Sequence, residues 1–175
     1  MEPHSPTVLP VTMNRLTPLS SILFICMGNI CRSPAGENVM RKLLQDAGLA
    51  DQVRCDSAGT LGYHSGASPD SRMHAAGQKR GLPMTGKARQ VTRVDLSLFD
   101  LILAMDDDNY RELQTLATEQ NRHKIKLFCE YCVTHRDNEV PDPYYGGPEG
   151  FEHVLDLLED GCTQILQVIK GTHEI

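Results

Sequence analysis

Short apolar runs alternate along the chain with longer stretches of helical spacing. The run 22–25 reads Ile-Leu-Phe-Ile, which is typical of a buried strand, whereas the stretch 35–47 places Val39, Leu43 and Leu44 on one helical face. This alternation favours an α/β domain with a mainly parallel sheet. The expected strands are 21–26, 52–57, 99–105 and 124–128, and the expected helices are 35–47, 69–79, 92–98, 106–118 and 150–169. The sequence therefore predicts four strands and about five helices in one domain.

The length of the chain indicates its domain organisation. At 175 residues the chain supports one hydrophobic core, and we expect a flexible extension over 1–19 followed by a domain over 20–175. The extension holds four prolines and no sustained apolar segment of a secretory signal, and no apolar run approaches the length that crosses a bilayer.

Six cysteines in such a chain are expected to be thiols, because the cytosol keeps them reduced. We therefore expect a cytoplasmic protein.

The charge balance of the chain limits the classes of partner that it is expected to bind. A formal net charge of −6 and a pI near 5.6 argue against a generic binder of nucleic acids or anionic membranes, since both usually carry a basic face. A local basic pocket remains compatible with this balance.

The segment 26–34, Cys-Met-Gly-Asn-Ile-Cys-Arg-Ser-Pro, lies between the first expected strand and helix. A loop at such a junction can aim successive backbone N–H groups at one anion, and the helix dipole adds positive potential. Gly28 permits tight curvature, Asn29 tolerates a left-handed conformation, and Arg32 offers a planar fork for two phosphate oxygens. The same field favours the nucleophilic thiolate of Cys26, and Ser33 can donate a hydrogen bond to it. The alternative, a buried strand-end thiol beside an ordinary turn, fits a lone Cys-Arg pair better than it fits the whole string.

A general acid is expected in the segment 141–145, Pro-Asp-Pro-Tyr-Tyr. Two prolines stiffen the backbone around Asp142, so its carboxyl group can be held over a pocket without a helix or strand. Tyr144 and Tyr145 would wall that pocket. A Pro-Asp-Pro turn with exposed tyrosines is the structural alternative.

Together these residues resemble the low-molecular-weight protein tyrosine phosphatase family over about 22–170, with details nearer to its bacterial, especially cyanobacterial-type, members. Besides 26–34 and 142–146, the matching segments in chain order are 56–60, Tyr63-His64 before Gly66, 88–90, 99–100 and 105–106. One departure is visible: Arg80 precedes Gly81 where vertebrate members place a histidine. The bracing of the loop by this part of the chain is therefore open.

The resemblance implies a four-stranded parallel sheet flanked by helices and a metal-independent hydrolase without cofactors. It implies Cys26 as nucleophile, Arg32 as phosphate clamp and Asp142 as acid and then base. Phosphotyrosine in a protein would be the substrate, and a bacterial tyrosine kinase would be a further partner. The phosphate-binding loop would comprise Met27, Gly28, Asn29, Ile30, Cys31, Arg32 and Ser33, with support from Asn29, Ser33 and Ser57 and a substrate pocket formed by Met27, Ile30, Tyr63, His64, Tyr144 and Tyr145.

Two cysteine pairs leave alternatives open. In the resembled family a residue placed like Cys31 can pair with the nucleophile and protect it from over-oxidation, yet a small packed hydrophobe fits equally well. Cys129 and Cys132 form a Cys-x-x-Cys pair that can indicate zinc or redox chemistry, but only His135 lies close as a further zinc ligand. We therefore expect no metal.

Two rival functions are an arsenate reductase, which uses a similar oxyanion loop, and a binding module without catalysis. A thioredoxin-coupled arsenate reductase needs further cysteines on a mobile segment, and residues 85–105 contain none. A non-catalytic phosphotyrosine-binding module needs no pairing of Cys26 with Asp142. The sequence therefore favours a phosphatase.

Overall fold

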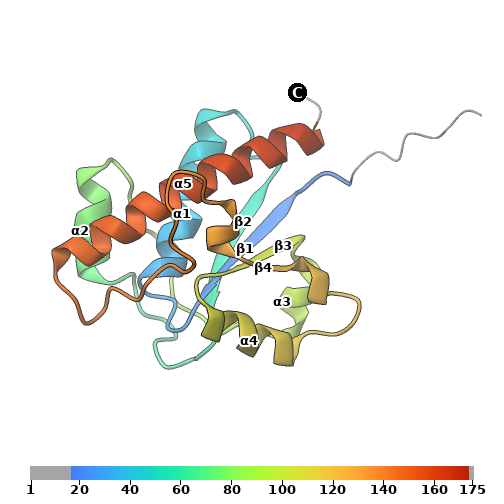
Figure 1. Cartoon of the computed structure of the whole chain (residues 1–175), viewed down its shortest axis with the longest axis horizontal. Coiled ribbons are helices and arrows are strands. Elements are labelled where there is room, and N and C mark those ends of the chain that lie inside the picture. Colours follow the sequence, from blue (N-terminus) through green and yellow to red (C-terminus); the bar gives the residue numbers. More distant parts are fainter. Residues whose placement is uncertain (1–16, 174–175) are drawn as a thin grey trace, which may run out of the picture.

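A single parallel sheet organises the protein in a computed structural model that describes residues 17–173. Its four strands are β1 (Ser21–Cys26), β2 (Arg54–Gly59), β3 (Leu101–Ala104) and β4 (Ile125–Leu127). They lie in the order β2-β1-β3-β4, and every neighbouring pair is parallel. Figure 1 shows the sheet running through the middle of the molecule with helices on both faces.

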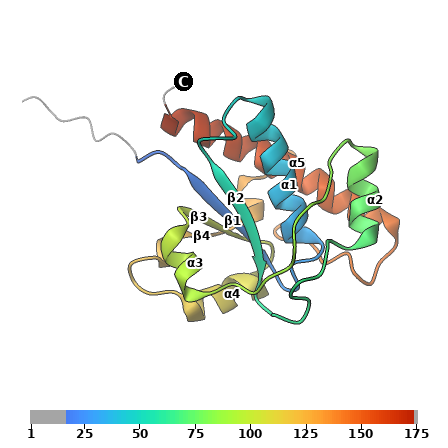
Figure 2. The same cartoon turned by 180° about the vertical axis from the view of Figure 1, so that it is seen from behind.

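Five α-helices cover the sheet: α1 (Arg32–Asp46), α2 (Ser71–Lys79), α3 (Arg93–Leu98), α4 (Asp107–Leu116) and α5 (Pro148–His173). Helices α1, α2 and α5 lie on one side, and α3 and α4 lie on the other, as both views show (Figures 1 and 2). The 3₁₀ turns η1 (Arg122–Lys124) and η2 (Phe128–Tyr131) flank β4.

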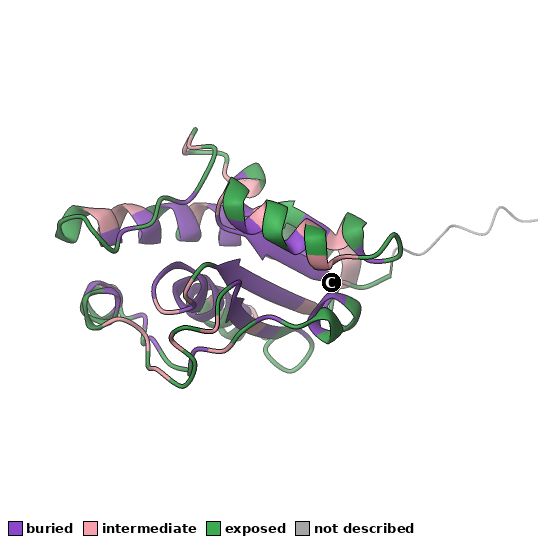
Figure 3. Ribbon diagram, turned by 90° about the horizontal axis from the view of Figure 1, so that it is seen from below, coloured by how far each residue is buried: buried purple, intermediate pink, exposed green. Residues whose placement is uncertain are grey.

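The alternation of side chains along β1 explains the two helical layers. Ile22 and Phe24 join the core that contains the buried residues of α1 and α5, whereas Leu23 and Ile25 join the core under α3 and α4. All four side chains are fully buried. Because β1 is central and covered on both faces, it is a continuous apolar run rather than an alternating one. Figure 3 shows the buried sheet between helices whose outer faces are exposed.

Side-chain caps set the starts of three helices. The Asp70 carboxylate accepts from Arg72 N at the start of α2, Asp106 accepts from Asn109 N at α4, and Thr92 with Asp95 forms a capping box at α3. Each cap satisfies backbone donors that have no partner within the helix. The caps at Asp70 and Asp106 also border the site described below.

The expected fold class is confirmed, with differences at element ends. Helix α1 begins at Arg32 rather than at residue 35, because the loop winds directly into the helix and Pro34 occupies its third position. Helix α5 extends to His173, beyond the expected end at 169, and the two 3₁₀ turns were not expected.

The N-terminal segment is only partly described. Residues 1–16, most of the expected extension, lie outside the described residues. Leu19 bonds to the end of α5, through Thr172 Oγ1 at 3.1 Å and His173 Nε2 at 2.8 Å. The boundary between residues 19 and 20 stays a prediction. No helix among residues 17–173 has the length and apolar character that crossing a membrane requires.

Candidate active site

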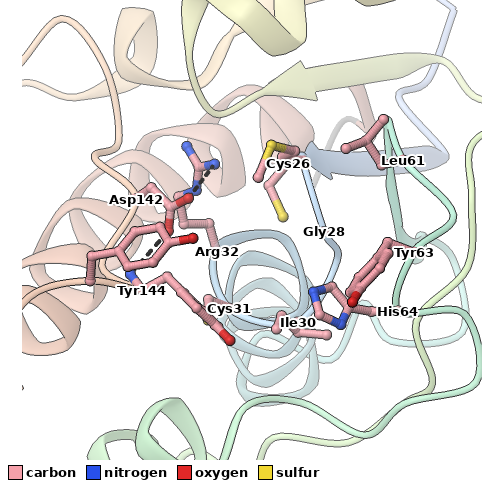
Figure 4. A pocket seen from close by; sticks show the side chains of 12 residues that line it. Cys26, Gly28, Ile30, Cys31, Arg32, Leu61, Tyr63, His64, Asp142 and Tyr144 are labelled. Atoms are coloured by element: carbon pink, nitrogen blue, oxygen red, sulfur yellow. Dashed lines mark hydrogen bonds and ion pairs between the residues drawn. The ribbon is translucent and has the colours of Figure 1, made fainter.

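The site lies where the chain reverses the direction in which it builds the sheet. From β1 the chain passes through α1 to β2 on one side, and β3 then pairs with β1 on the other side. In open α/β sheets, the carboxyl ends of strands at such a switch point leave a crevice. A pocket of about 400 Å³ opens there, at the end of β1 (Figure 4). Its lining residues are Cys26, Met27, Gly28, Ile30, Cys31, Arg32, Leu61, Tyr63, His64, Asp142, Tyr144 and Tyr145.

Asn29 holds the loop between β1 and α1 in shape. It is 3% exposed and has φ of 56°, a left-handed conformation that Asn tolerates better than most residues. Its Nδ2 donates to Ser33 Oγ at 2.8 Å and to Ser57 Oγ at 2.9 Å, and its Oδ1 accepts from Arg89 N at 3.0 Å. The three bonds tie the loop to α1, to β2 and to the segment before α3.

The Cys26 sulfur lies at the base of the pocket within hydrogen-bond reach of two groups. Ser33 Oγ is 3.0 Å from it, and Asn29 N donates to it at 3.2 Å. The residue is 2% exposed, so a reaction partner must approach through the pocket.

The end of β2 supports the loop at van der Waals distance. A Cβ at Gly59 would lie 2.6 Å from the carbonyl oxygen of Met27, so only glycine fits. Thr60 N donates to Cys26 O at 2.9 Å and Leu61 N donates to Met27 O at 3.0 Å. These backbone bonds place Leu61 at the pocket wall.

Arg32 points into the pocket from the first turn of α1 and is 3% exposed. Its Nη1 donates to Asp106 Oδ2 at 2.6 Å and to Val140 O at 3.0 Å. Burial alone would lower the pKa of Arg32, but the negative charges of Cys26 and Asp106 raise it overall. The guanidinium is therefore a fixed positive charge beside the sulfur.

Asp142 faces Arg32 across the pocket, with Oδ2 3.8 Å from Nη2. Its Oδ1 accepts from Tyr144 N at 3.0 Å, and its side chain is 37% exposed. Figure 4 shows Asp142 and Tyr144 on one side of the pocket and Tyr63 with His64 on the opposite side. Tyr63 and Tyr145 are largely exposed and form the outer rim.

Cys31 lines the same pocket but is 5% exposed. Burial, followed by the charges of Asp70 and Cys26, raises the pKa of the Cys31 thiol to about 12. A thiol with this pKa stays protonated at neutral pH, which makes it a poor nucleophile by itself.

Of the residues expected in the site from the sequence, all but Ser57 border this pocket or bond to a residue that does, and Ser57 bonds to Asn29. Two further residues were not assigned to it from the sequence: Leu61 lines the wall, and Arg72 contacts Tyr144. Asp106, which lies in the matching segment 105–106 and is expected from its strand-end position to orient part of the site, binds Arg32. No local sequence signal marks Leu61, because its place at the wall follows from the pairing of Cys26 with Gly59 across the sheet, two residues before it.

Arg80, the departure from the family pattern, has its side chain bonded to α5 and not to the site. Arg80 binds Glu152, Asp156 and Glu159 of α5 at 2.6, 2.9 and 3.4 Å. It therefore joins the end of α2 to α5, and none of its side-chain hydrogen bonds within residues 17–173 reaches the loop 26–32. Among residues 17–173, no three His, Cys, Asp or Glu side chains are grouped so as to hold a metal ion.

Comparison with known proteins agrees with this geometry. Residues 21–174 match the family model for the low molecular weight phosphotyrosine protein phosphatase. A Synechocystis protein assigned to the same phosphatase family is 55% identical over 148 residues, covering 83% of this chain and 93% of that protein. The cyanobacterial relative agrees with the resemblance expected from the sequence.

Solved structures show the same fold. A protein tyrosine phosphatase from Entamoeba histolytica with Hepes in its active site superposes with a TM-score of 0.84 at 46% identity, covering 89% of this chain and 98% of that chain. Vibrio vulnificus Wzb in complex with benzylphosphonate superposes with a TM-score of 0.75 at 28% identity, covering 86% and 99%. With its matching sequence, fold and loop, the chain belongs to the low molecular weight phosphotyrosine protein phosphatase family.

Proposed function

We propose that this phosphatase hydrolyses phosphotyrosine in proteins through a phosphocysteine on Cys26. The observation that carries the proposal is the meeting of three groups in one pocket: the buried Cys26 sulfur, the Arg32 guanidinium and the Asp142 carboxyl group. A nucleophile, a fixed cation and an acid around one cavity are the parts that phosphoryl transfer requires.

In the first step the Cys26 thiolate attacks phosphorus and the bond to the tyrosine oxygen breaks. Asp142 gives its proton to the departing phenolate oxygen, while Arg32 and the loop amides stabilise the equatorial oxygens. Asp106 and Val140 O, both bonded to Arg32 Nη1, hold the guanidinium in place. A preorganised cation of this kind needs no rearrangement when charge develops.

In the second step Asp142, now a carboxylate, removes a proton from water. The water oxygen attacks phosphorus, the sulfur–phosphorus bond breaks, and phosphate is released. Ser33 Oγ, 3.0 Å from the Cys26 sulfur, donates a hydrogen bond to the departing thiolate. Asn29 and Ser57 act through Ser33 and the loop shape.

The pocket walls support an aryl substrate. Tyr144 on one side and Tyr63 with His64 on the other border a slot whose nucleophile lies at its base. A seryl phosphate would not span this depth, which is a geometric form of specificity. The Vibrio vulnificus protein binds benzylphosphonate, in which one methylene group separates phosphorus from the aromatic ring. In phosphotyrosine one oxygen atom takes that place. A tyrosine kinase that phosphorylates the substrate is the implied partner, and in its autophosphorylated form it would itself be a substrate.

The test is hydrolysis of p-nitrophenyl phosphate and of matched phosphotyrosyl and phosphoseryl peptides at pH 5–7 with EDTA present. We expect turnover of the two aryl substrates, no turnover in Cys26→Ser, and a decrease of about a hundredfold or more in Asp142→Ala. Acid quenching of Asp142→Ala during turnover should trap phosphate on the peptide that contains Cys26. Metal-dependent activity, or full activity in Cys26→Ser, would contradict the mechanism.

A further inference from the structure

Cys129 and Cys132 form the one Cys-x-x-Cys motif of the sequence, and the phosphatase site makes no use of it. Cys129 lies in η2, the 3₁₀ turn that follows β4 and packs against α5, and Cys132 is the residue directly after this turn. Neither residue lines the pocket at Cys26.

The turn places the two side chains on the same side of the backbone. Cys132 N donates to Cys129 O at 3.1 Å, the i to i+3 bond that defines a 3₁₀ turn. With three residues per turn, side chains at i and i+3 eclipse one another, and a rise of about 2 Å per residue puts their Cα atoms roughly 6 Å apart. Disulfide-bonded cysteines span about 4.4–6.8 Å between Cα atoms.

The two thiols differ in access. Cys129 is 8% exposed and belongs to the core, whereas Cys132 is half-buried, with its Sγ 3.5 Å from Leu157 O on α5. An incoming reactant therefore reaches Cys132 first. Such an arrangement, one accessible sulfur backed by one buried sulfur, is that of an attacking and a resolving thiol.

The electrostatics assign the same roles. The contact between the two thiols lowers the pKa of Cys132, and the same contact together with burial raises the pKa of Cys129. Cys132, the accessible member, is therefore the more readily ionised thiol of the pair, and its Sγ donates to Leu157 O while it is protonated.

The surroundings keep the turn in place while the bond forms. Asp160 of α5 accepts hydrogen bonds from Val133 N, Thr134 N and His135 N at 2.9–3.1 Å, so the residues after Cys132 are already fixed. Before Cys132, the buried ring of Phe128 sits over Gly161, where any side chain would overlap it. His135 is bonded to Asp160 through Nδ1 at 2.9 Å as well.

We propose that Cys129 and Cys132 form a thiol–disulfide exchange site, separate from the phosphatase pocket, whose reactant is a small-molecule or protein disulfide. The Cys132 thiolate attacks one sulfur of the disulfide R–S–S–R, forms a mixed disulfide and releases the first thiolate. Cys129 gives up its proton to that thiolate and attacks the Cys132 sulfur, which releases the second thiolate. Two protein thiols become one disulfide while R–S–S–R becomes two thiols, so atoms and electrons balance.

The experiment uses the reduced full-length wild-type protein, equilibrated with oxidised and reduced glutathione at increasing ratio, alkylated with N-ethylmaleimide and digested with trypsin. The tryptic peptide 127–136 contains Cys129 and Cys132, and the peptide 16–32 contains Cys26 and Cys31, so one digest reports the two pairs independently. We expect peptide 127–136 to lose both alkylatable thiols and to become lighter by two hydrogen atoms. Retention of both maleimide groups at every ratio would overturn the proposal, as would a stable glutathione adduct on the wild-type peptide.

Two variants test the order of attack. Cys129→Ala should accumulate a glutathione adduct on Cys132, because the resolving thiol is gone, whereas Cys132→Ala should leave Cys129 free while the protein is folded. Glutathione on Cys129 in folded Cys132→Ala would reverse the assignment and overturn it. Circular dichroism reports whether each variant folds, and the wild-type digest decides the proposal without them. The readout is a thiol count, so it is independent of phosphatase activity.

Discussion

Arg72 holds Tyr144 by two contacts: Nη1 donates to the Tyr144 carbonyl oxygen at 2.8 Å, and the guanidinium carbon lies 5.0 Å from the centroid of its ring. Asp70 fixes Arg72 through Oδ2 at 2.9 Å from Nη2, and Asp70 N donates to Ile30 O at 2.8 Å. Asp70 and Arg72 thus connect the phosphate loop with the segment that carries Asp142.

Replacing Arg72 by methionine should therefore loosen this segment without touching the phosphate. We expect kcat/KM for p-nitrophenyl phosphate to fall about tenfold, because small misplacements of a catalytic group are costly, while inhibition by inorganic phosphate changes little. Steady-state kinetics with phosphate inhibition measures both.

Arg80→Met is the matched control. Arg80 lies at the end of α2, and its side chain also points to α5. Its partners there are Glu152, Asp156 and Glu159, which do not line the pocket. It should cost about 1 kcal/mol of stability and leave kcat/KM unchanged. Equal kinetic effects in the two variants would show that Arg72 acts only through stability.

The Asp106–Arg32 ion pair gives a second prediction. In Asp106→Asn the amide oxygen can still accept from Asn109 N, so α4 keeps its cap, since Asn and Asp cap equally well. The charge that holds Arg32 Nη1 at 2.6 Å is lost. We expect inhibition by inorganic phosphate to weaken about tenfold, because the guanidinium loses its fixed position. The urea midpoint should fall as well, because a charge-assisted bond worth about 1.5–3 kcal/mol is lost. Unaltered phosphate inhibition would show that Val140 O alone positions Arg32.

The fold followed from the sequence because its signals are local. Apolar runs, helical spacing and turn residues fixed the four strands and five helices, and the Cys26–Pro34 string marked the loop. Arg72 carries no comparable signal, and Asp106 carries only its strand-end position and the matching segment 105–106. Their contacts with Tyr144 and Arg32 join residues 72 and 74 positions apart, and only the packing of α2 and α4 around the sheet brings them together. The helix ends were predicted less accurately than the helices themselves. At the start of α1 the loop continues directly into the helix, so the pattern of apolar residues does not mark the boundary.

Asn29 offers a third prediction that separates conformation from bonding. Asn29→Gly keeps the left-handed φ of 56° and loses three side-chain bonds, whereas Asn29→Ala loses the same bonds and adds strain. We expect Ala to be less stable than Gly by about 1 kcal/mol in urea unfolding. Both should be poor phosphatases, because Ser33 and the loop lose their brace. A Gly variant with full activity would show that conformation alone supports the loop.

Asp160 provides a prediction about pH. Its side chain is 4% exposed, and burial alone would raise its pKa, but hydrogen bonds from His135, Val133 and Thr134 lower the pKa below its ordinary value. A carboxyl group with a lowered folded-state pKa stabilises the protein fully above its unfolded pKa of about 3.9, and this contribution is lost as pH falls through the folded value. Asp160→Asn should therefore cost about 2 kcal/mol at pH 7, the scale of hydrogen bonds to a charged group.

The diagnostic quantity is the difference in unfolding free energy between wild type and Asp160→Asn, measured in urea from pH 7 to pH 3. The difference should stay large down to about pH 4 and shrink below it, because the protonated wild-type carboxyl group loses the charge that the variant already lacks. Glu159→Gln is the control: this neighbour is 47% exposed and makes a 3.4 Å ion pair with Arg80, so its removal should have a small effect. A difference for Asp160→Asn that does not shrink on acidification would assign its role to packing rather than to charge.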